Sequence, residues 1–133
     1  MNVASRAPQM KRDWLDWPFF GESHRTFPGA LDRFVASGAI AAINHGDVDA
    51  SCRKLAWALG EAGLLDAAVA SPDGDASAID SRSVCLARET LAYHDGLADF
   101  AFAMQIACAC ASDSMISSRP IAHSWLSIVL VMP

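Results

Sequence analysis

The sequence has few of the features that mark a nucleic-acid, nucleotide or membrane function. Its ten basic residues are scattered among fifteen acidic ones, with a formal net charge of −5, so no basic stripe is present to contact nucleic acid. Its glycines form neither a Walker loop nor a dinucleotide fingerprint. The apolar run from Ser124 to Met132 is shorter than the roughly 20 residues that a membrane span requires. We therefore expect neither nucleic-acid binding nor membrane insertion.

The start of the chain and its cysteines predict a reducing compartment. Residues Met1 to Arg12 are polar and basic with no apolar segment behind them, so we expect a cytoplasmic protein without a secretory signal. The cysteines lie in alanine-rich stretches, and we expect reduced thiols that act as small apolar fillers. They are Cys52, Cys85, Cys108 and Cys110.

Length and composition predict one packed domain. A chain of 133 residues can bury a single core but leaves no room for a second domain. Hydrophobic residues make up 53% and charged residues 19%, with a mean hydropathy of +0.23. This excess of apolar residues suits a fragment that buries surface against other domains, so we expect poor solubility when it is alone.

A first helix is predicted by apolar residues that recur at three-and-four spacing, with a histidine on the same line. These residues are Phe20, His24, Phe27, Leu31 and Phe34. Pro28 interrupts the pattern, and a proline inside a helix costs about 3 kcal/mol. The helix therefore either starts near Thr26 or is kinked there, and we expect a late start or a short preceding turn.

Three further helices are predicted after the turn at Asn44 to Asp47. Asp47 caps the second, which Gly63 ends, and its apolar face is Val48, Cys52, Leu55, Leu59 and Ala62. Asp80 caps the third, which stops near Asp95. The fourth runs from Leu97 to about Cys110 with Leu97, Phe100, Ala101 and Met104 on one face.

The predicted fold is all-α, an antiparallel bundle of about four helices with short loops. Residues 1–18 form an irregular lead-in, whose Trp14, Leu15 and Trp17 offer anchors to some surface. Residues 19–105 form the helical domain. Residues 106–133 form an atypical tail.

Individual residues predict no convincing active site. His94 and Asp95 form half of the signature of metal-dependent phosphohydrolases, but no further histidines match it. Cys108 and Cys110 with His123 lack the second cysteine pair of a zinc site. A cysteine nucleophile at position 52 or 85 would need a nearby histidine. From the residues alone, the chain is a helical domain without a visible catalytic site.

Two segments resemble the N-terminal helical domain of the acyl-CoA dehydrogenase family. Between Glu61 and Val69 a helix ends at Gly-Leu-Leu, as in the family, although Ala70 replaces the family's proline and Asp73-Gly74-Asp75 replaces its Tyr-Gly-Gly turn. The segment from Asp80 to Gln105 is similar to the family's helix pair, in which Arg-Glu-x-Leu precedes an aspartate, a turn and a helix rich in small residues. The stretch Trp17 to Arg25 is similar to the family's first helix. The family's Gly-rich turn and β-domain do not follow, which suggests a truncated or frameshifted end.

The resemblance implies an FAD-dependent α,β-dehydrogenation of an acyl-CoA thioester, in a homo-oligomer that passes its electrons to an electron-transfer flavoprotein. In the family the catalytic glutamate and most of the flavin site lie in later domains. The resemblance therefore implies a fragment that is inactive alone, with no catalytic, flavin-binding or metal-binding residue of its own. Glu61 and Glu89 are scaffold residues in this interpretation. The substrate-pocket candidates are Phe102 and Gln105 on the fourth helix.

Two alternatives remain open. One is a helical interaction module without catalytic activity, which docks on a partner through Trp14, Trp17 and the apolar tail. The other is a small metal-dependent hydrolase that uses His94 and Asp95.

Overall fold

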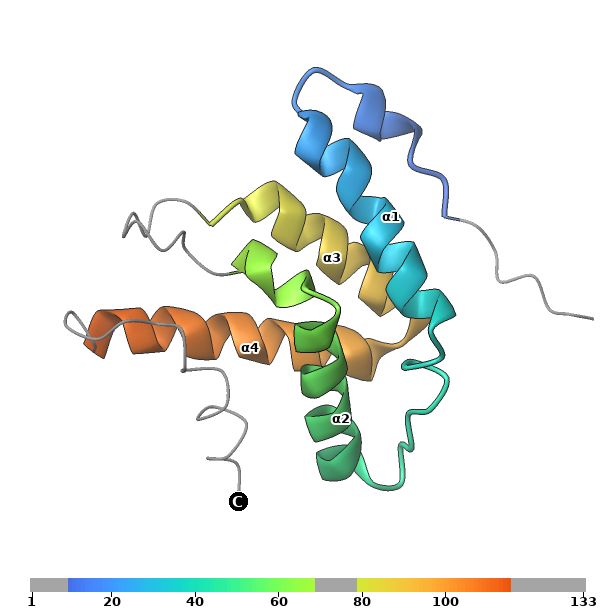
Figure 1. The fold of residues 1–133 in the computed structure, drawn as a ribbon, viewed down its shortest axis with the longest axis vertical. Helices are drawn as coiled ribbons and strands as arrows, with labels where there is room; N and C mark the ends of the chain where they lie inside the picture. The colour runs from blue at the N-terminus through green and yellow to red at the C-terminus, as the bar shows by residue number, and fades with distance from the viewer. Residues whose placement is uncertain (1–9, 69–78, 116–133) are drawn as a thin grey trace, which may run out of the picture.

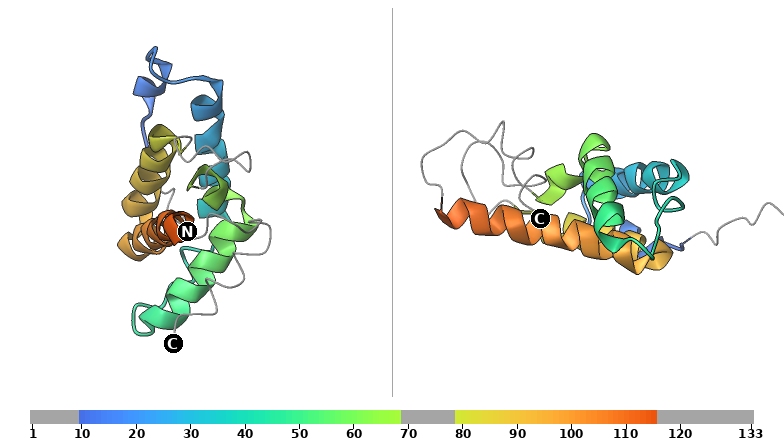
Figure 2. Two further views of the ribbon diagram at one scale, coloured as in Figure 1. Left: turned by 90° about the vertical axis from the view of Figure 1, so that its left-hand side faces the viewer. Right: turned by 90° about the horizontal axis from the view of Figure 1, so that it is seen from below.

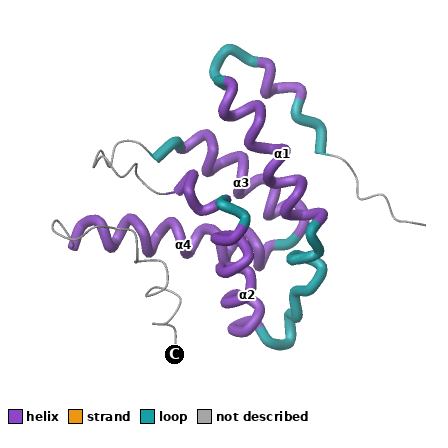
Figure 3. Tube along the Cα trace, in the orientation of Figure 1, coloured by secondary structure: helices purple, strands orange, loops and turns teal. Residues whose placement is uncertain are grey.

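All regular elements in the described part of the chain are helical. The computed structural model describes residues 10–68 and 79–115, and within these ranges Figure 3 shows helices and loops without a strand. The predicted all-α bundle of four helices is therefore confirmed. In chain order the elements are the 3-10 helix η1 (Asp13–Asp16), α1 (Glu22–Ala36), α2 (Val48–Glu61), the 3-10 helix η2 (Leu64–Ala68), α3 (Ser81–His94) and α4 (Gly96–Met115).

Consecutive α-helices reverse direction, and α3 is the helix that links the others. In Figures 1 and 2, α1 and α3 lie side by side and run the same way, whereas α4 crosses beside them. Helix α3 packs against both α1 and α4, and α2 packs against α4. Helices α1 and α2 follow one another in the chain but make few direct contacts. One side of the bundle is therefore open between α1 and α2.

The core is a single apolar cluster to which all four α-helices and η2 contribute. Each fully buried leucine or phenylalanine contributes about 1.5 to 3 kcal/mol through the apolar surface that it removes from water. The buried members are Leu31, Phe34, Leu55, Leu59, Leu64, Leu65, Ala87, Leu91, Ala98, Ala101 and Phe102.

Helix α1 starts earlier than the sequence predicts and carries Pro28 inside it. The predicted start near Thr26 is therefore wrong. Pro28 has no N–H to donate to the carbonyl of His24. The first turn is held instead by the His24 ring, which accepts a hydrogen bond from the Gly21 N–H at 2.9 Å and bonds Asp80 at the start of α3. These contacts hold the turn of α1 that precedes the proline.

The predicted helix caps are confirmed. The Asp47 carboxylate accepts a hydrogen bond from the Ala50 N–H at 3.1 Å at the start of α2, and Asp80 accepts one from the Arg82 N–H at 3.2 Å at the start of α3. After α2, Gly63 has a φ of +67°, in the left-handed region that favours glycine. Local sequence signals thus set these helix ends.

The buried face of α4 differs from the predicted one. The predicted face included Phe100, but Phe100 is 52% exposed. The buried residues are instead Ala98, Ala101, Phe102 and Gln105. Each lies one residue after a predicted position, so the buried face is turned by about 100° around the helix axis from the predicted face. The prediction failed because α4 is apolar on nearly every side, so that periodicity did not select a face. The helix also continues beyond the predicted end at Cys110 to Met115.

The lead-in and the cysteines follow their predictions only in part. Leu15 in η1 is buried, but Trp17 is 58% exposed and does not anchor the lead-in to this domain. Cys52 is half-buried, whereas Cys85 is exposed because it falls opposite the buried face of α3, so the filler role is wrong for Cys85. The predicted loop at 71–75, the side chain of Cys110 and the tail after position 115 lie outside the described residues.

Candidate functional site

A polar cluster built around the buried His24 joins the start of α1 to the start of α3. We call His24, Asp80, Arg82 and Ser83 the His24–Asp80 cluster. The His24 side chain is 4% exposed, and its Nε2 bonds Asp80 Oδ2. The same oxygen accepts the Ser83 hydroxyl at 3.0 Å, and Asp80 Oδ1 accepts the Arg82 N–H and Nε–H, each at 3.2 Å. Two residues 56 positions apart are thereby tied together.

The directions of these hydrogen bonds exclude a serine-nucleophile triad. In such a triad a histidine nitrogen accepts the serine proton. Here the Ser83 hydroxyl donates to Asp80 instead, and His24 Nδ1 accepts from Gly21, so His24 Nε2 carries the ring proton. No ring nitrogen of His24 remains to act as a general base. The cluster therefore serves to position α1 on α3.

The carboxylate of Asp80 is held in its ionised form. Burial raises the pKa of Asp80, but hydrogen bonds from His24, Arg82 and Ser83 together outweigh burial and lower the pKa to about 2. A carboxylate with such a low pKa is a poor proton acceptor at neutral pH. The electrostatics thus agree with the geometry on a structural role.

A second polar contact ties the lead-in to the bundle. The Arg12 guanidinium donates to both oxygens of Asp32 on α1 at 3.0 to 3.1 Å. It also donates to the hydroxyl of Thr90 on α3 at 3.0 Å, and Thr90 is 1% exposed. Bidentate arginine–carboxylate pairs are the stronger kind of ion pair. Arg12 therefore holds the segment that precedes η1 against both α1 and α3.

The two substrate-pocket candidates from the sequence lie on the core face of α4. Phe102 is fully buried in the apolar cluster, and Gln105 is 8% exposed one turn further along. Both side chains thus lie on the same face of α4. Packing in the core is sufficient to explain why they are buried there. Their contact with a substrate stays a prediction.

The structure gives no support to the metal-dependent hydrolase. Asp95 Oδ2 bonds His45 Nε2 at 3.0 Å, and Asp95 Oδ1 accepts the Leu97 N–H at 2.8 Å, which caps α4. The His94 ring instead packs edge-on against Tyr93, with 5.3 Å between ring centroids. Within residues 10–68 and 79–115, no three His, Cys, Asp or Glu side chains gather as a metal site would need. Asp95 therefore acts as a helix cap.

A nucleophilic role is disfavoured for Cys52. Burial and the nearby negative charge of Asp49 raise the pKa of the Cys52 thiol. Because the thiolate is the nucleophilic form, a raised pKa lowers its reactivity at neutral pH. His123, which was considered with Cys108 as a metal ligand, lies outside the described residues.

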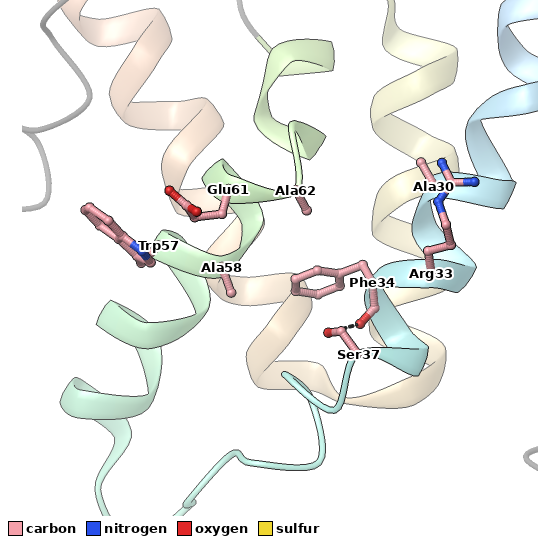
Figure 4. A pocket seen from close by; sticks show the side chains of 8 residues that line it. All are labelled: Ala30, Arg33, Phe34, Ser37, Trp57, Ala58, Glu61 and Ala62. Atoms are coloured by element: carbon pink, nitrogen blue, oxygen red, sulfur yellow. Dashed lines mark hydrogen bonds between the residues drawn. The ribbon is translucent and has the colours of Figure 1, made fainter.

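A hollow lies between α1 and α2, with a volume of about 540 Å³. Figure 4 shows Phe34 reaching from α1 toward α2, with Arg33 on the α1 side and Glu61 on the α2 side. The indole of Trp57, on α2, is 55% exposed. We call this hollow the α1–α2 groove; it is lined by Ala30, Arg33, Phe34, Ser37, Trp57, Ala58, Glu61 and Ala62. Sequence periodicity missed it because it depends on two helices lying apart.

Comparison with known proteins identifies no relative. No protein-family model matches the chain, and no curated protein or solved structure matches it either. Among the helices that the structure describes, none has both the length and the apolarity that crossing a membrane would take. Any functional proposal therefore depends on the residues and their arrangement.

Proposed function

We propose that the chain is the N-terminal helical domain of an acyl-CoA dehydrogenase, an FAD-dependent enzyme that oxidises the α,β-bond of an acyl-CoA thioester. The observation that carries the proposal is the segment from Asp80 to Gln105, where the resemblance to the family's helix pair coincides with α3 and α4. In this pair Arg88, from the Arg-Glu-x-Leu motif, donates two hydrogen bonds to Asp99 at 2.8 and 2.9 Å. The motif therefore has a physical role in joining the two helices.

The end of α2 gives a second line of support. The resembling Gly-Leu-Leu run begins at Gly63, which turns the chain after α2, and Leu64 and Leu65 then enter the core at 1% and 5% exposure. The resembling residues thus include the turn after α2 and two core leucines, and not only exposed positions that tolerate many residue types.

The roles that we propose for this domain exclude catalysis by its own residues. It would cover one side of the acyl pocket, with Phe102 and Gln105 as the substrate-facing candidates, in a cytoplasmic homo-oligomer that transfers electrons to an electron-transfer flavoprotein. The described residues do not fit FAD by themselves. The α1–α2 groove offers one cation, Arg33, opposite one anion, Glu61, whereas a pyrophosphate requires several converging donors. Other domains would hold the flavin and supply the catalytic base.

A titration of the purified chain with FAD, followed by flavin fluorescence and ended with an acyl-CoA, tests these roles. We expect no FAD binding. Tight binding with bleaching of the flavin by acyl-CoA would contradict the assignment of the flavin site to other domains.

The coding DNA downstream of Pro133 tests family membership itself. We expect a continuation, in this or another reading frame, that encodes a β-domain and a C-terminal helical domain. A protein made from the restored reading frame should bind FAD and be reduced by an acyl-CoA. A restored protein that binds FAD but is reduced by no acyl-CoA would contradict the proposal, as would the absence of any such continuation.

The second candidate is a helical interaction module without catalytic activity. The specific observation in its favour is the α1–α2 groove, an apolar hollow beside the exposed Trp57. Absence of a downstream β-domain would favour this candidate over the enzyme fragment.

A further inference from the structure

The α1–α2 groove has an apolar floor between two rims of opposite charge. Phe34, 4% exposed, forms part of the floor, and Ala30 and Ala58 beside it are half-buried. The rim on α1 carries Arg33 and the rim on α2 carries Glu61 (Figure 4). The part of the lining that is open to contact from outside is Trp57, Ser37 and the half-buried alanines, because Phe34 itself is already buried.

Neither rim charge has a partner in the described part of the molecule. The ion pairs between described residues involve other side chains, and neither Arg33 nor Glu61 takes part in them. Both residues are exposed. An exposed arginine and an exposed glutamate on the two rims of an apolar groove, without a partner, are available to pair with charges on a docked surface.

This charge arrangement is complementary to itself. A two-fold axis that runs along the groove places α1 of one copy opposite α2 of the other. Arg33 of each copy then faces Glu61 of the other, and both pairs form at once, as in an isologous interface. The same operation brings the exposed Trp57 of each copy, one turn before Glu61, toward the small residue Ser37 of the other, one turn after Arg33. Tryptophan and arginine are the residue types that most often dominate binding energy at interfaces.

We propose that the α1–α2 groove is a homodimer interface, in which a second copy of this chain packs α1 against α2 across a two-fold axis. The exposed Trp57 and the half-buried Ala30 and Ala58 supply the apolar area that the second copy covers, and the reciprocal Arg33–Glu61 pairs set the register. This inference is independent of the acyl-CoA dehydrogenase proposal, because it uses only the groove and its charges.

The test is sedimentation velocity of the full chain over a concentration series, with charge-reversal variants at the rims. Arg33→Glu and Glu61→Arg each place like charges opposite one another in the dimer, and each should raise the dimer Kd by about tenfold or more. An equimolar mixture of the two variants should recover dimers, because the copy with two acidic rims then meets the copy with two basic rims. The double variant should also dimerise. Glu89→Arg, an exposed reversal on α3 away from the groove, should leave the Kd unchanged.

The mixture separates an intermolecular pair from an attraction within one chain. If Arg33 and Glu61 acted only within their own chain, mixing the single variants would restore nothing. The proposal is overturned if the wild-type chain stays monomeric throughout the series, if the single variants dimerise like wild type, or if the mixture fails to recover dimers. Circular dichroism at 222 nm identifies any variant that is unfolded, and Trp57→Glu, at an exposed position, then provides the second disruption of the same interface.

Discussion

Replacing Asp80 with alanine should destabilise the fold, because its carboxylate holds two helices together. The carboxylate caps α3 through the Arg82 N–H and also accepts the proton of the buried His24. Loss of the cap costs about 1 kcal/mol. An unsatisfied buried donor at His24 costs about 1 to 3 kcal/mol more. The expected total is about 2 to 4 kcal/mol.

Asparagine at the same position tests the geometry more sharply. Asparagine is as good a helix cap as aspartate. It offers a single acceptor oxygen, however, whereas Asp80 uses Oδ1 for Arg82 and Oδ2 for His24 and Ser83. An Asp80→Asn side chain that keeps the cap must turn its NH₂ group toward the His24 donor. We expect a loss of about 1 to 3 kcal/mol, where a purely local cap would predict almost none.

The pH dependence of this contribution has a definite sign. The folded pKa of Asp80, about 2, lies below its ordinary value of 3.8. The stabilisation is therefore complete above about pH 3.8 and is lost as the pH falls through about 2. The shift corresponds to about 2 kcal/mol, and since a third of the side chain is exposed, solvent screening reduces it to about 1 to 2 kcal/mol.

Urea unfolding followed by circular dichroism measures all three effects. With a slope of about 1 to 3 kcal/mol per molar, Asp80→Ala should lower the midpoint by about 1 to 3 M at pH 7. Asp49→Ala, an exposed aspartate in the first turn of α2, is the matched control and should change stability by no more than about 0.5 kcal/mol. Equal midpoints for Asp80→Asn and wild type would refute the two-oxygen account. So would a difference between wild type and Asp80→Ala that does not shrink as the pH falls toward 2.

Three further predictions use the same unfolding assay. Arg12→Ala should cost about 1 to 3 kcal/mol, since it removes a bidentate ion pair and a bond to a buried hydroxyl; a change within error would show that the lead-in is not held by this contact. Gly63→Ala should destabilise the fold by about 1 kcal/mol, because Gly63 has a φ of +67°. Gly29→Ala in α1 should stabilise the fold by about 0.5 to 1 kcal/mol, because an added Cβ meets nothing within 4 Å. If both substitutions changed stability in the same direction, the backbone argument would be contradicted. Phe102→Ala should cost about 3 to 5 kcal/mol and Phe100→Ala less than about 1 kcal/mol, and the reverse order would restore the face of α4 that the sequence predicted.

The sequence predictions were correct where the interacting residues are close in the chain and wrong where they are far apart in it. The capping carboxylates of Asp47 and Asp80 act on backbone groups two or three residues away, so the sequence identifies them directly. The predicted start of α1 was wrong because the prediction considered only Pro28, whereas the first turn of α1 also bonds Asp80, 56 residues beyond His24. A local rule for proline could not include that contact.

The face of α4 illustrates a second kind of limit. An amphipathic helix tells which side is buried, but α4 has apolar residues on nearly every side, so two registers one residue apart fit equally well. Only packing against α2, α3 and η2 selected the face with Phe102. Cys85 was misassigned for a related reason, because a small apolar residue is compatible with either face of a helix.

The sequence alone determined the helical class, the ends of α2 and α3, and the buried leucines Leu31, Leu55 and Leu59, because these depend on hydrophobic periodicity and on short-range hydrogen bonds. Its prediction for the apolar face of α2 was wrong at Val48, which is 46% exposed, and at Ala62, which is also exposed. The tertiary structure decided which polar residues meet. It directed the Ser83 hydroxyl to Asp80 rather than to His24, which removed a catalytic interpretation of the cluster. It also held α1 and α2 apart, so that Arg33 and Glu61 face one groove. Such arrangements depend on distances between segments remote in the chain, and no local pattern encodes them.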